Sequence, residues 1–363
     1  MNKKKGRNVQ KKIFYLLIIL VILFGALNIM KARGLFIPEQ PLLYFTNRVI
    51  DLDSLTLEQK IAQMVIVVGA KENYWPWKNM QLGGIHLFAR QNEHIFNNTI
   101  IDFQSEMPVP FFVTADLEGC VSPFGFIREF IAASEVNTAE QAFEKGADEG
   151  KFLQKLGFNL NFAPVVDLDD DIWKCRTFPG DEHKIAELAE AYITGLQTEG
   201  VIGTAKHYPG KTLVVKDPHK FVVQAEIGKN DIYPYEYLLD QGNVKAIMVS
   251  HIITSGEIIS EGMPSVASKK VVDDLRKNFD GLIITDEIHM LGLKNFYGTI
   301  DEMYVGVFKA GNDVVLNFDN NPNEIYRMIQ VVKAAVERGE IPDTQIDASV
   351  KRILEAKGFA VIS

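Results

Sequence analysis

The segment from Lys206 to His219, KHYPGKTLVVKDPH, contains a Lys-His pair, a Pro-Gly turn and an Asp-x-His pair. A later apolar run, GLIITDE, delivers a carboxylate, Asp286. A histidine transfers protons near neutral pH, and a separate carboxylate can attack carbon. Retaining hydrolysis of a glycosidic bond requires these two kinds of group. These residue types therefore indicate hydrolytic chemistry, provided that the fold brings them together.

Asp217 and His219 flank Pro218, a pattern that on its own indicates an exposed Asp-Pro turn with an incidental histidine. They also follow KHYPG at the end of an apolar strand, where a long loop can fold over a pocket. In that setting Asp217 would orient His219 and stabilise its protonated form, making His219 a proton donor to a leaving oxygen.

Asp286 likewise has two interpretations. An Asp after a strand commonly caps the next helix. As a nucleophile, Asp286 would instead attack the anomeric carbon and form a glycosyl ester, which water breaks with His219 as base. The adjacent Glu287 is a rival nucleophile. We expect Asp286 to be the nucleophile, because the residue that ends a strand points more dependably toward the pocket.

Lys206 and His207 would be costly to bury without partners, so their place at a strand end suggests paired polar groups or recognition of hydroxyl groups. Asp116, Glu118 and Arg176 are candidates for the same work, although each alone is also typical of a structural ion pair. The sequence has no HExxH or CxxC spacing and no GxGxxG or GxxxxGK[ST] loop. We therefore expect no metal and no nucleotide cofactor.

Near-continuous apolar strands alternate with amphipathic helices, which predicts a parallel sheet covered by helices. A capping box at Thr56 and Gln59 opens the folded region, and Gly157 ends a predicted helix over 138–156. Further helices are predicted over 184–198, 233–241 and 299–310, and after Ser268. The predicted strands end in polar residues: Asp116, Asp167, His207, His251, Asp286 and Asn317. Such residues at many strand ends favour a TIM-type (β/α)8-like barrel over a doubly wound sheet.

The net charge of -9 argues against a nucleic-acid ligand, and the 47% hydrophobic composition is that of a folded protein. Residues 1–12 form a basic flank, and 13–30 are apolar apart from Asn28. This pattern predicts a transmembrane signal-anchor with its basic end in the cytoplasm, then a linker over 31–50 and one extracytoplasmic domain over 51–363. A cleaved signal peptide, which would release a secreted protein, is the rival interpretation.

Two cysteines, Cys120 and Cys175, are too few for a disulfide scaffold. From their types and number alone, one bridge and two unpaired thiols remain equally open.

Many ordered landmarks resemble glycoside hydrolase family 3, and within it the single-domain bacterial β-N-acetylglucosaminidases of the NagZ type. They include GGIHLF at 83, ADLEG at 115, GTAKHYPG at 203, DPH at 217 and ITDEIHM at 284. The resemblance runs from about residue 55 to IDASVKRIL at 346. It implies a barrel in which Asp286 is the nucleophile and Asp217 with His219 is the acid/base dyad. It also places Asp116, Arg176, Lys206 and His207 around the sugar.

The implied activity is that of a retaining exo-β-N-acetylglucosaminidase acting on amino-sugar chains or peptidoglycan fragments. Two segments depart from the family pattern, EGCVS from Glu118 and PGKTL from Pro209. They leave two alternatives open: a catalytically weakened barrel that binds wall sugars or a partner protein, and a family 3 glycosidase of different sugar specificity. The resemblance also puts Cys120 and Cys175 on neighbouring sugar-site loops, which makes a disulfide beside the active site a specific expectation.

Overall fold

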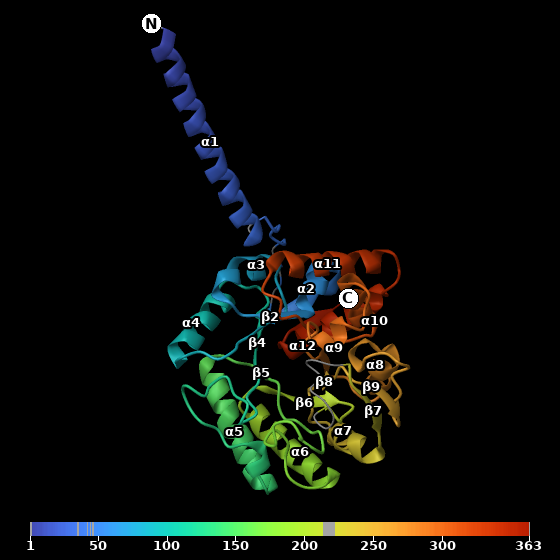
Figure 1. Cartoon of the computed structure of the whole chain (residues 1–363). Coiled ribbons are helices and arrows are strands. Elements are labelled where there is room, and N and C mark those ends of the chain that lie inside the picture. The colour runs from blue at the N-terminus through green and yellow to red at the C-terminus, as the bar shows by residue number, and fades with distance from the viewer. Residues whose placement is uncertain are drawn as a thin grey trace.

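The computed structural model describes residues 2–34, 36–41, 43, 45, 47–212 and 222–362. A sheet of eight parallel strands forms the centre of the molecule, helices surround it, and one long helix projects from the body (Figure 1). The predicted Asp217 and His219 lie outside the described residues.

The eight strands follow one another around the sheet in chain order. They are β2 (Val65–Val68), β3 (Gly84–His86), β4 (Phe112–Ala115), β5 (Leu160–Asn161), β6 (Ile202–Tyr208), β8 (Ala246–Val249), β10 (Leu282–Thr285) and β11 (Val315–Leu316). A parallel bridge between Ile284 and Val314, and a 2.9 Å bond from the Thr285 N–H to the Val314 carbonyl, bring the two ends of the sheet together. The predicted TIM-type barrel is therefore confirmed.

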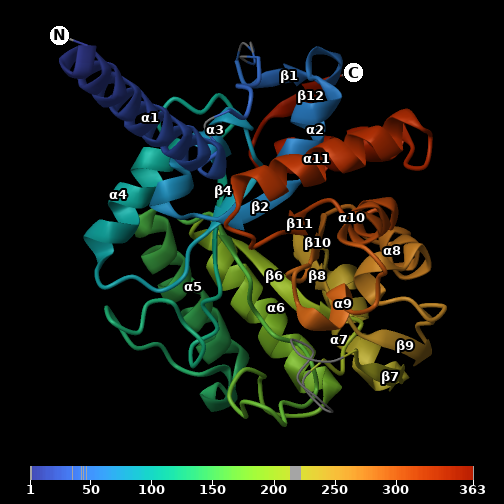
Figure 2. The same cartoon turned by 45° about the horizontal axis from the view of Figure 1, so that its top comes forward.

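Helices lie between consecutive strands and cover the outside of the barrel (Figures 1 and 2). They are α2 (Leu57–Gln63), α3 (Tyr74–Asn79), α4 (Glu93–Gln104), α5 (Ala139–Leu156), α6 (Glu182–Thr198), α7 (Lys229–Gln241), α8 (Lys269–Arg276), α9 (Leu291–Lys294), α10 (Ile300–Lys309), α11 (Pro322–Glu337) and α12 (Asp343–Ala356). Single 3₁₀ turns occur at Leu52–Ser54, Lys71–Asn73, Ala133–Glu135 and Ser265–Ala267.

The helix ends follow the sequence signals that predicted them. At the start of α2, the Gln59 N–H donates to Thr56 Oγ1 at 3.2 Å and the Thr56 N–H donates to Gln59 Oε1 at 2.9 Å, which completes the capping box. Ser268 caps α8, and Gly157 ends α5 with a left-handed φ of 98° that a residue without a Cβ adopts at little cost. These three ends confirm the predicted signals, whereas α7 begins at Lys229, four residues before the predicted start at 233.

One strand is shorter than the sequence suggests. NLNFAPVV reads as one buried strand, but β5 has regular pairing only at Leu160 and Asn161. Pro164 has no N–H to donate to a ladder, and after it the chain returns to the sheet only through isolated bridges from Val165 to Lys206 and Thr177. The segment still carries Asp167 to the carboxyl end of the barrel.

The projecting helix is α1 (Asn2–Ala32), shown in dark blue in Figure 1. Its window Phe14–Lys31 has a mean hydropathy of 2.3 and none of it is buried, so it is long and apolar enough to cross a membrane. It meets the barrel next to α3 and α11. There Asn323 Nδ2 donates to the Lys31 carbonyl at 2.9 Å.

Residues 36–41, which we call the strap, lead from α1 along the barrel. The Gln40 N–H donates to the Asn79 carbonyl at 2.9 Å, and the Gln40 side chain donates to Glu58 Oε1 at 2.6 Å. Beyond the strap, β1 (Val49–Asp51) pairs in parallel with β12 (Ala360–Ile362), so the start and the end of the barrel domain lie side by side (Figure 2). The remaining two strands, β7 (Gln224–Ile227) and β9 (Ile253–Gly256), form a separate parallel pair.

Helices α5 and α6 pack with their backbones in contact. A Cβ placed on Gly146 would lie 2.1 Å from the Tyr192 carbonyl oxygen, and one on Gly195 would lie 2.2 Å from the Phe143 carbonyl oxygen. These glycines therefore hold the two helices at their close spacing.

We predict that Gly146→Ala lowers the free energy of unfolding by about 1–3 kcal/mol, the usual cost of overpacking. Alanine otherwise favours a helix over glycine by about 1 kcal/mol, so a net loss would identify the backbone contact as its cause. Urea denaturation measures the change, with Gly125→Ala as control because a Cβ at Gly125 meets nothing within 4 Å. Equal stability of the two variants would contradict this view of the α5–α6 contact.

Candidate active site

A cavity of about 350 Å³ opens at the carboxyl ends of the barrel strands. This end of a TIM-type barrel is where active sites are found. The cavity is lined by Phe88, Asp116, Glu118, Val121, Phe162, Trp173, Arg176, Lys206, His207, Thr212, Met248, Asp286, Glu287, Met290, Leu316 and Phe318. It thus brings together every predicted site residue that the structure describes: Asp116, Arg176, Lys206, His207 and Asp286.

A network of four charged side chains forms one wall of the cavity. Lys206 Nζ lies 2.7 Å from Asp116 Oδ1 and 2.5 Å from Glu118 Oε1. Arg176 binds the same glutamate through two bonds, from Nε to Oε2 at 2.6 Å and from Nη2 to Oε1 at 3.0 Å. Two cations and two carboxylates therefore compensate one another, as buried charges require.

The contacts of the network favour the ionised forms of Asp116, Lys206 and Arg176. Burial alone would raise the pKa of Asp116, but the Lys206 ammonium lowers it below its usual value. Burial would also lower the pKa of Lys206, yet the Asp116 and Glu118 carboxylates raise it. Burial opposes the charge of Arg176 too, and Glu118 raises the pKa of Arg176. The wall therefore presents fixed charges to a ligand over the whole physiological pH range.

His86 completes this wall on the side of β3. Its Nε2 atom lies 3.6 Å from Asp116 Oδ2, its Nδ1 atom lies 3.0 Å from Thr114 Oγ1, and its ring stacks on Phe162 and Phe318. Burial lowers the pKa of His86 to about 4, with Lys206 adding to the effect, so the imidazole is neutral near pH 7. A neutral ring therefore lies beside Asp116 without adding another buried charge.

A disulfide joins the two loops that supply Glu118 and Arg176. Cys120 and Cys175 are bonded, with their Cα atoms 6.2 Å apart, which confirms the pairing that the family resemblance implied. Beside it, the Asp170 carboxylate accepts the backbone N–H groups of Trp173, Cys175 and Arg176 at 2.8–3.0 Å. The Arg176 guanidinium lies 4.6 Å from the centre of the Trp173 ring. The loop is therefore held by covalent, hydrogen-bonding and cation–π contacts close to the cavity.

Asp286 follows β10 and reaches the cavity opposite this network. Its backbone N–H donates to the Val249 carbonyl at 3.0 Å, which ties it to the end of β8. Its Oδ1 atom accepts the Glu287 N–H at 2.8 Å. The alternative role for Asp286, capping the next helix, would require that helix to begin directly after it. Helix α9 begins only at Leu291, after Met290.

Glu287, the rival nucleophile, is in a different environment. Its Oε1 atom accepts the N–H groups of His289 at 2.8 Å and Phe318 at 3.2 Å. Burial raises the pKa of Glu287 to about 7, so a large fraction of it is protonated at neutral pH. A carboxyl group that is part protonated and engaged by two backbone donors is poorly suited to act as a nucleophile.

His207 lies deeper in the site, and its Nδ1 atom is 3.4 Å from Asp167 Oδ2. The chain then passes Thr212, which also lines the cavity, before it enters the segment that carries Asp217 and His219. Within the described ranges, no group of three or more His, Cys, Asp or Glu side chains is arranged to hold a metal ion.

The structure adds His86, Trp173 and an aromatic wall to the residues that the sequence singled out. His86 sits in the GGIHLF landmark at the end of a strand, so the rule of polar strand ends could have found it. Trp173 lies in a loop without a regular pattern. Phe88, Phe162 and Phe318 look like core residues in the sequence, and nothing in their spacing distinguishes them.

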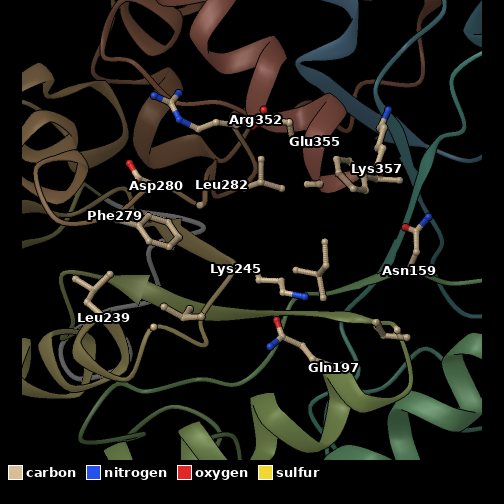
Figure 3. A pocket seen from close by; sticks show the side chains of 18 of the residues that line it. Asn159, Gln197, Leu239, Lys245, Phe279, Asp280, Leu282, Arg352, Glu355 and Lys357 are labelled. Carbon is tan, nitrogen blue, oxygen red and sulfur yellow. The ribbon is translucent and has the colours of Figure 1, made fainter. Parts of the chain in front are cut away.

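A larger cavity, of about 800 Å³, lies at the opposite end of the barrel (Figure 3). It is bordered by residues at or just before the starts of the strands, among them Asn159, Lys245 and Leu282, and by the end of α12 with Arg352 and Glu355. This end of a barrel generally serves stability. It holds none of the predicted catalytic or binding residues that the structure describes, so the smaller cavity is the candidate active site.

A parallel barrel with ionised carboxylates around a cavity at the carboxyl ends of its strands has the organisation of a TIM-type barrel enzyme. The model of the glycosyl hydrolase family 3 N terminal domain matches residues 56–356. The chain therefore belongs to glycosyl hydrolase family 3.

Named relatives agree with this assignment. The chain is 28% identical over 331 residues to the beta-hexosaminidase LpqI of Mycobacterium bovis. The matched region covers 84% of this chain and 83% of that relative. A crystal structure of a family 3 glycosyl hydrolase from Mycobacterium smegmatis superposes with a TM-score of 0.77 at 28% identity, covering 85% of this chain and 99% of that one. A family 3 beta-N-acetylglucosaminidase from Paenibacillus gives a TM-score of 0.76 at 26% identity, with 84% of this chain and 62% of that chain covered.

The raised pKa of Glu287 predicts a specific pH dependence of stability. The folded protein holds this proton up to about pH 7, whereas the unfolded chain loses it near 4.5. The stabilisation is therefore fully present below pH 4.5 and is lost as the pH rises to 7, at up to about 1.4 kcal/mol per pH unit. We predict that Glu287→Gln removes this loss, so that the variant gains stability relative to the parent between pH 5 and pH 7. Denaturation midpoints across this range measure the difference. The exposed Glu144→Gln is the control, and a pH-independent difference for Glu287→Gln would refute the assignment.

Proposed function

We propose that this chain is a retaining exo-β-N-acetylglucosaminidase that removes terminal β-linked N-acetylglucosamine from amino-sugar chains or peptidoglycan fragments. The observation that carries the proposal is the placement of Asp286 in one cavity with the network of Asp116, Glu118, Arg176 and Lys206. The names of the relatives support the choice of sugar, since a beta-hexosaminidase and a beta-N-acetylglucosaminidase are among them.

In the proposed reaction, Asp286 attacks the anomeric carbon while the bond to the leaving oxygen breaks. His219 donates a proton to that oxygen, and Asp217 orients the imidazole. The product of this step is a glycosyl ester on Asp286. Water then attacks the same carbon, His219 takes the proton from the water, and Asp286 leaves as a carboxylate. Two inversions at one carbon retain its configuration.

Exposure distinguishes the roles within the charged network. The Asp116 side chain is 33% exposed, whereas those of Lys206, Glu118 and Arg176 are 3%, 2% and 9% exposed. We infer that Asp116 is the network's main contact with the sugar, accepting hydrogen bonds from its hydroxyl groups, while Lys206 and Arg176 border the site and hold the carboxylates in place. His207, with a side chain 6% exposed, would border the sugar from the floor of the cavity.

The cavity volume of about 350 Å³ is at the lower end of the range for small-molecule sites. A site of this size favours the binding of one terminal residue over a long internal stretch of glycan, which supports an exo-acting enzyme. Trp173, which is 37% exposed, lies at its border.

We further propose that 13–30 anchor the protein in the cell membrane, with 1–12 in the cytoplasm and 51–363 as the catalytic domain outside. The Cys120–Cys175 bond supports an extracytoplasmic site, because disulfides persist in oxidising compartments. A cleaved signal peptide would place the same domain in the same compartment, released from the membrane.

A panel of chromogenic β-glycosides tests the activity of the purified full chain. We predict turnover of the N-acetylglucosaminide with a kcat/KM at least tenfold above that for the matching glucoside and xyloside. Binding of N-acetylglucosamine without turnover would instead support a barrel that only recognises wall sugars. Preferred turnover of another glycoside would change the sugar assignment and leave the family unaffected.

Variants of the reacting groups test the residue assignments. We predict that Asp286→Ala abolishes turnover of all N-acetylglucosaminides, because no ester can form. His219→Ala should slow a substrate with a poor leaving group by about 10²–10⁴-fold and an activated aryl substrate less, since the latter needs little protonation. Steady-state kinetics with both substrates measure this difference. Activity retained in Asp286→Ala, with Glu287→Gln inactive, would move the nucleophile to Glu287.

A further inference from the structure

The helix α1 joins the barrel at the border of its catalytic face. The β2–α3 and β11–α11 connections both leave the carboxyl ends of their strands, which is the end that holds the candidate active site. Asn73 of the first connection donates to the Asn320 carbonyl of the second at 2.7 Å. In Figure 1, α3 and the start of α11 lie at the part of the barrel nearest to α1.

Specific contacts fix this junction. Asn323, in the first turn of α11, donates to the carbonyl of Lys31 at the end of α1. Gly34 packs so closely on Pro322 that a Cβ on this glycine would lie 2.7 Å from the Pro322 Cβ. Its positive φ of 68° turns the chain from α1 toward the strap. The end of α1 and the residues just after it are therefore packed against the first turn of α11.

The distance from this junction to the active site is bounded by the chain itself. Phe318 lines the cavity, and Pro322, four residues later, touches Gly34. A fully extended chain advances at most about 3.6 Å per residue, so the Cα atoms of Phe318 and Pro322 are no more than about 15 Å apart. If α1 spans a bilayer up to Lys31, the wall of the cavity lies close to the membrane surface.

Exposed aromatic side chains occur on this side of the molecule. Trp75 on α3 is 60% exposed and Phe36 at the start of the strap is 56% exposed. Phe88, which lines the cavity, is 46% exposed. Aromatic rings favour the interface between lipid headgroups and water. Phe36 follows the end of α1 along the chain, Trp75 lies on α3 beside α1, and Phe88 lies at the cavity itself.

We propose that the catalytic face borders the membrane and that the enzyme acts on terminal β-N-acetylglucosaminyl groups of glycans attached to lipids in the same bilayer. The proposal rests on the proposed activity and on insertion of α1. When enzyme and substrate are both held on one membrane surface, each meets the other at a high effective concentration. A cavity that opened away from the membrane would instead favour glycans in the surrounding wall.

The test uses the full chain reconstituted in phosphatidylcholine vesicles. The probe is N-acetylglucosamine β-linked through a short spacer to a two-chain lipid, placed either in the same vesicles as the enzyme or in separate vesicles. A soluble chromogenic N-acetylglucosaminide measures the number of accessible active sites in each sample. We expect the rate on the lipid probe, divided by the rate on the soluble substrate, to be at least tenfold higher when enzyme and probe share vesicles.

Two aromatic variants sharpen the test. Trp75→Ala should lower the shared-vesicle rate at least threefold and leave the soluble rate unchanged, since Trp75 takes no part in the active site. Phe143→Ala, which removes a ring that is 40% exposed on α5, is the matched control and should change neither rate. Equal rates in shared and separate vesicles, with normal turnover of the soluble substrate, would overturn the membrane proposal alone. Failure to hydrolyse the soluble substrate would overturn the proposed activity itself.

Discussion

Charged side chains buried at the end of a barrel must be neutralised by one another, and this requirement organises the active site. Lys206 from β6, Asp116 after β4, and Glu118 and Arg176 from two loops meet within 2.5–3.0 Å. Removing one member would leave another charge buried without compensation, which costs several kcal/mol. The network therefore does two things at once: it fixes the loops that surround the cavity and it keeps Asp116 ionised toward it.

A disulfide lies directly beside this network. EGCVS introduces Cys120, and Cys120 is bonded to Cys175, the neighbour of Arg176. A covalent link between the two loops supports the Glu118–Arg176 pair in addition to the Asp170 carboxylate that holds the second loop. The disulfide and the ion pair therefore hold the same two loops together.

Sequence patterns predicted the barrel and much of the site, because both depend on local signals. Alternating apolar strands and capped helices defined the fold, and polar strand ends located Asp116, His207 and Asp286. The early end of β5 was not predicted, because the apolar pattern of this segment does not show where its backbone hydrogen bonds to the neighbouring strands are interrupted, at Pro164. The wall that Phe162 and Phe318 form around His86 could not be predicted either, because packing between strands distant in sequence decides which side of a ring faces a cavity.

The strap follows α1 directly in the sequence, but its contacts are with the barrel. Ile37 is 6% exposed and Gln40 is 8% exposed, and Gln40 is bonded to the barrel at Asn79 and Glu58. A protease that cut between Ala32 and Ile37 would therefore shed a complete barrel with its cavity and disulfide intact. If α1 anchors the protein as proposed, such a cut would convert a surface-bound form into a diffusible form with the same active site.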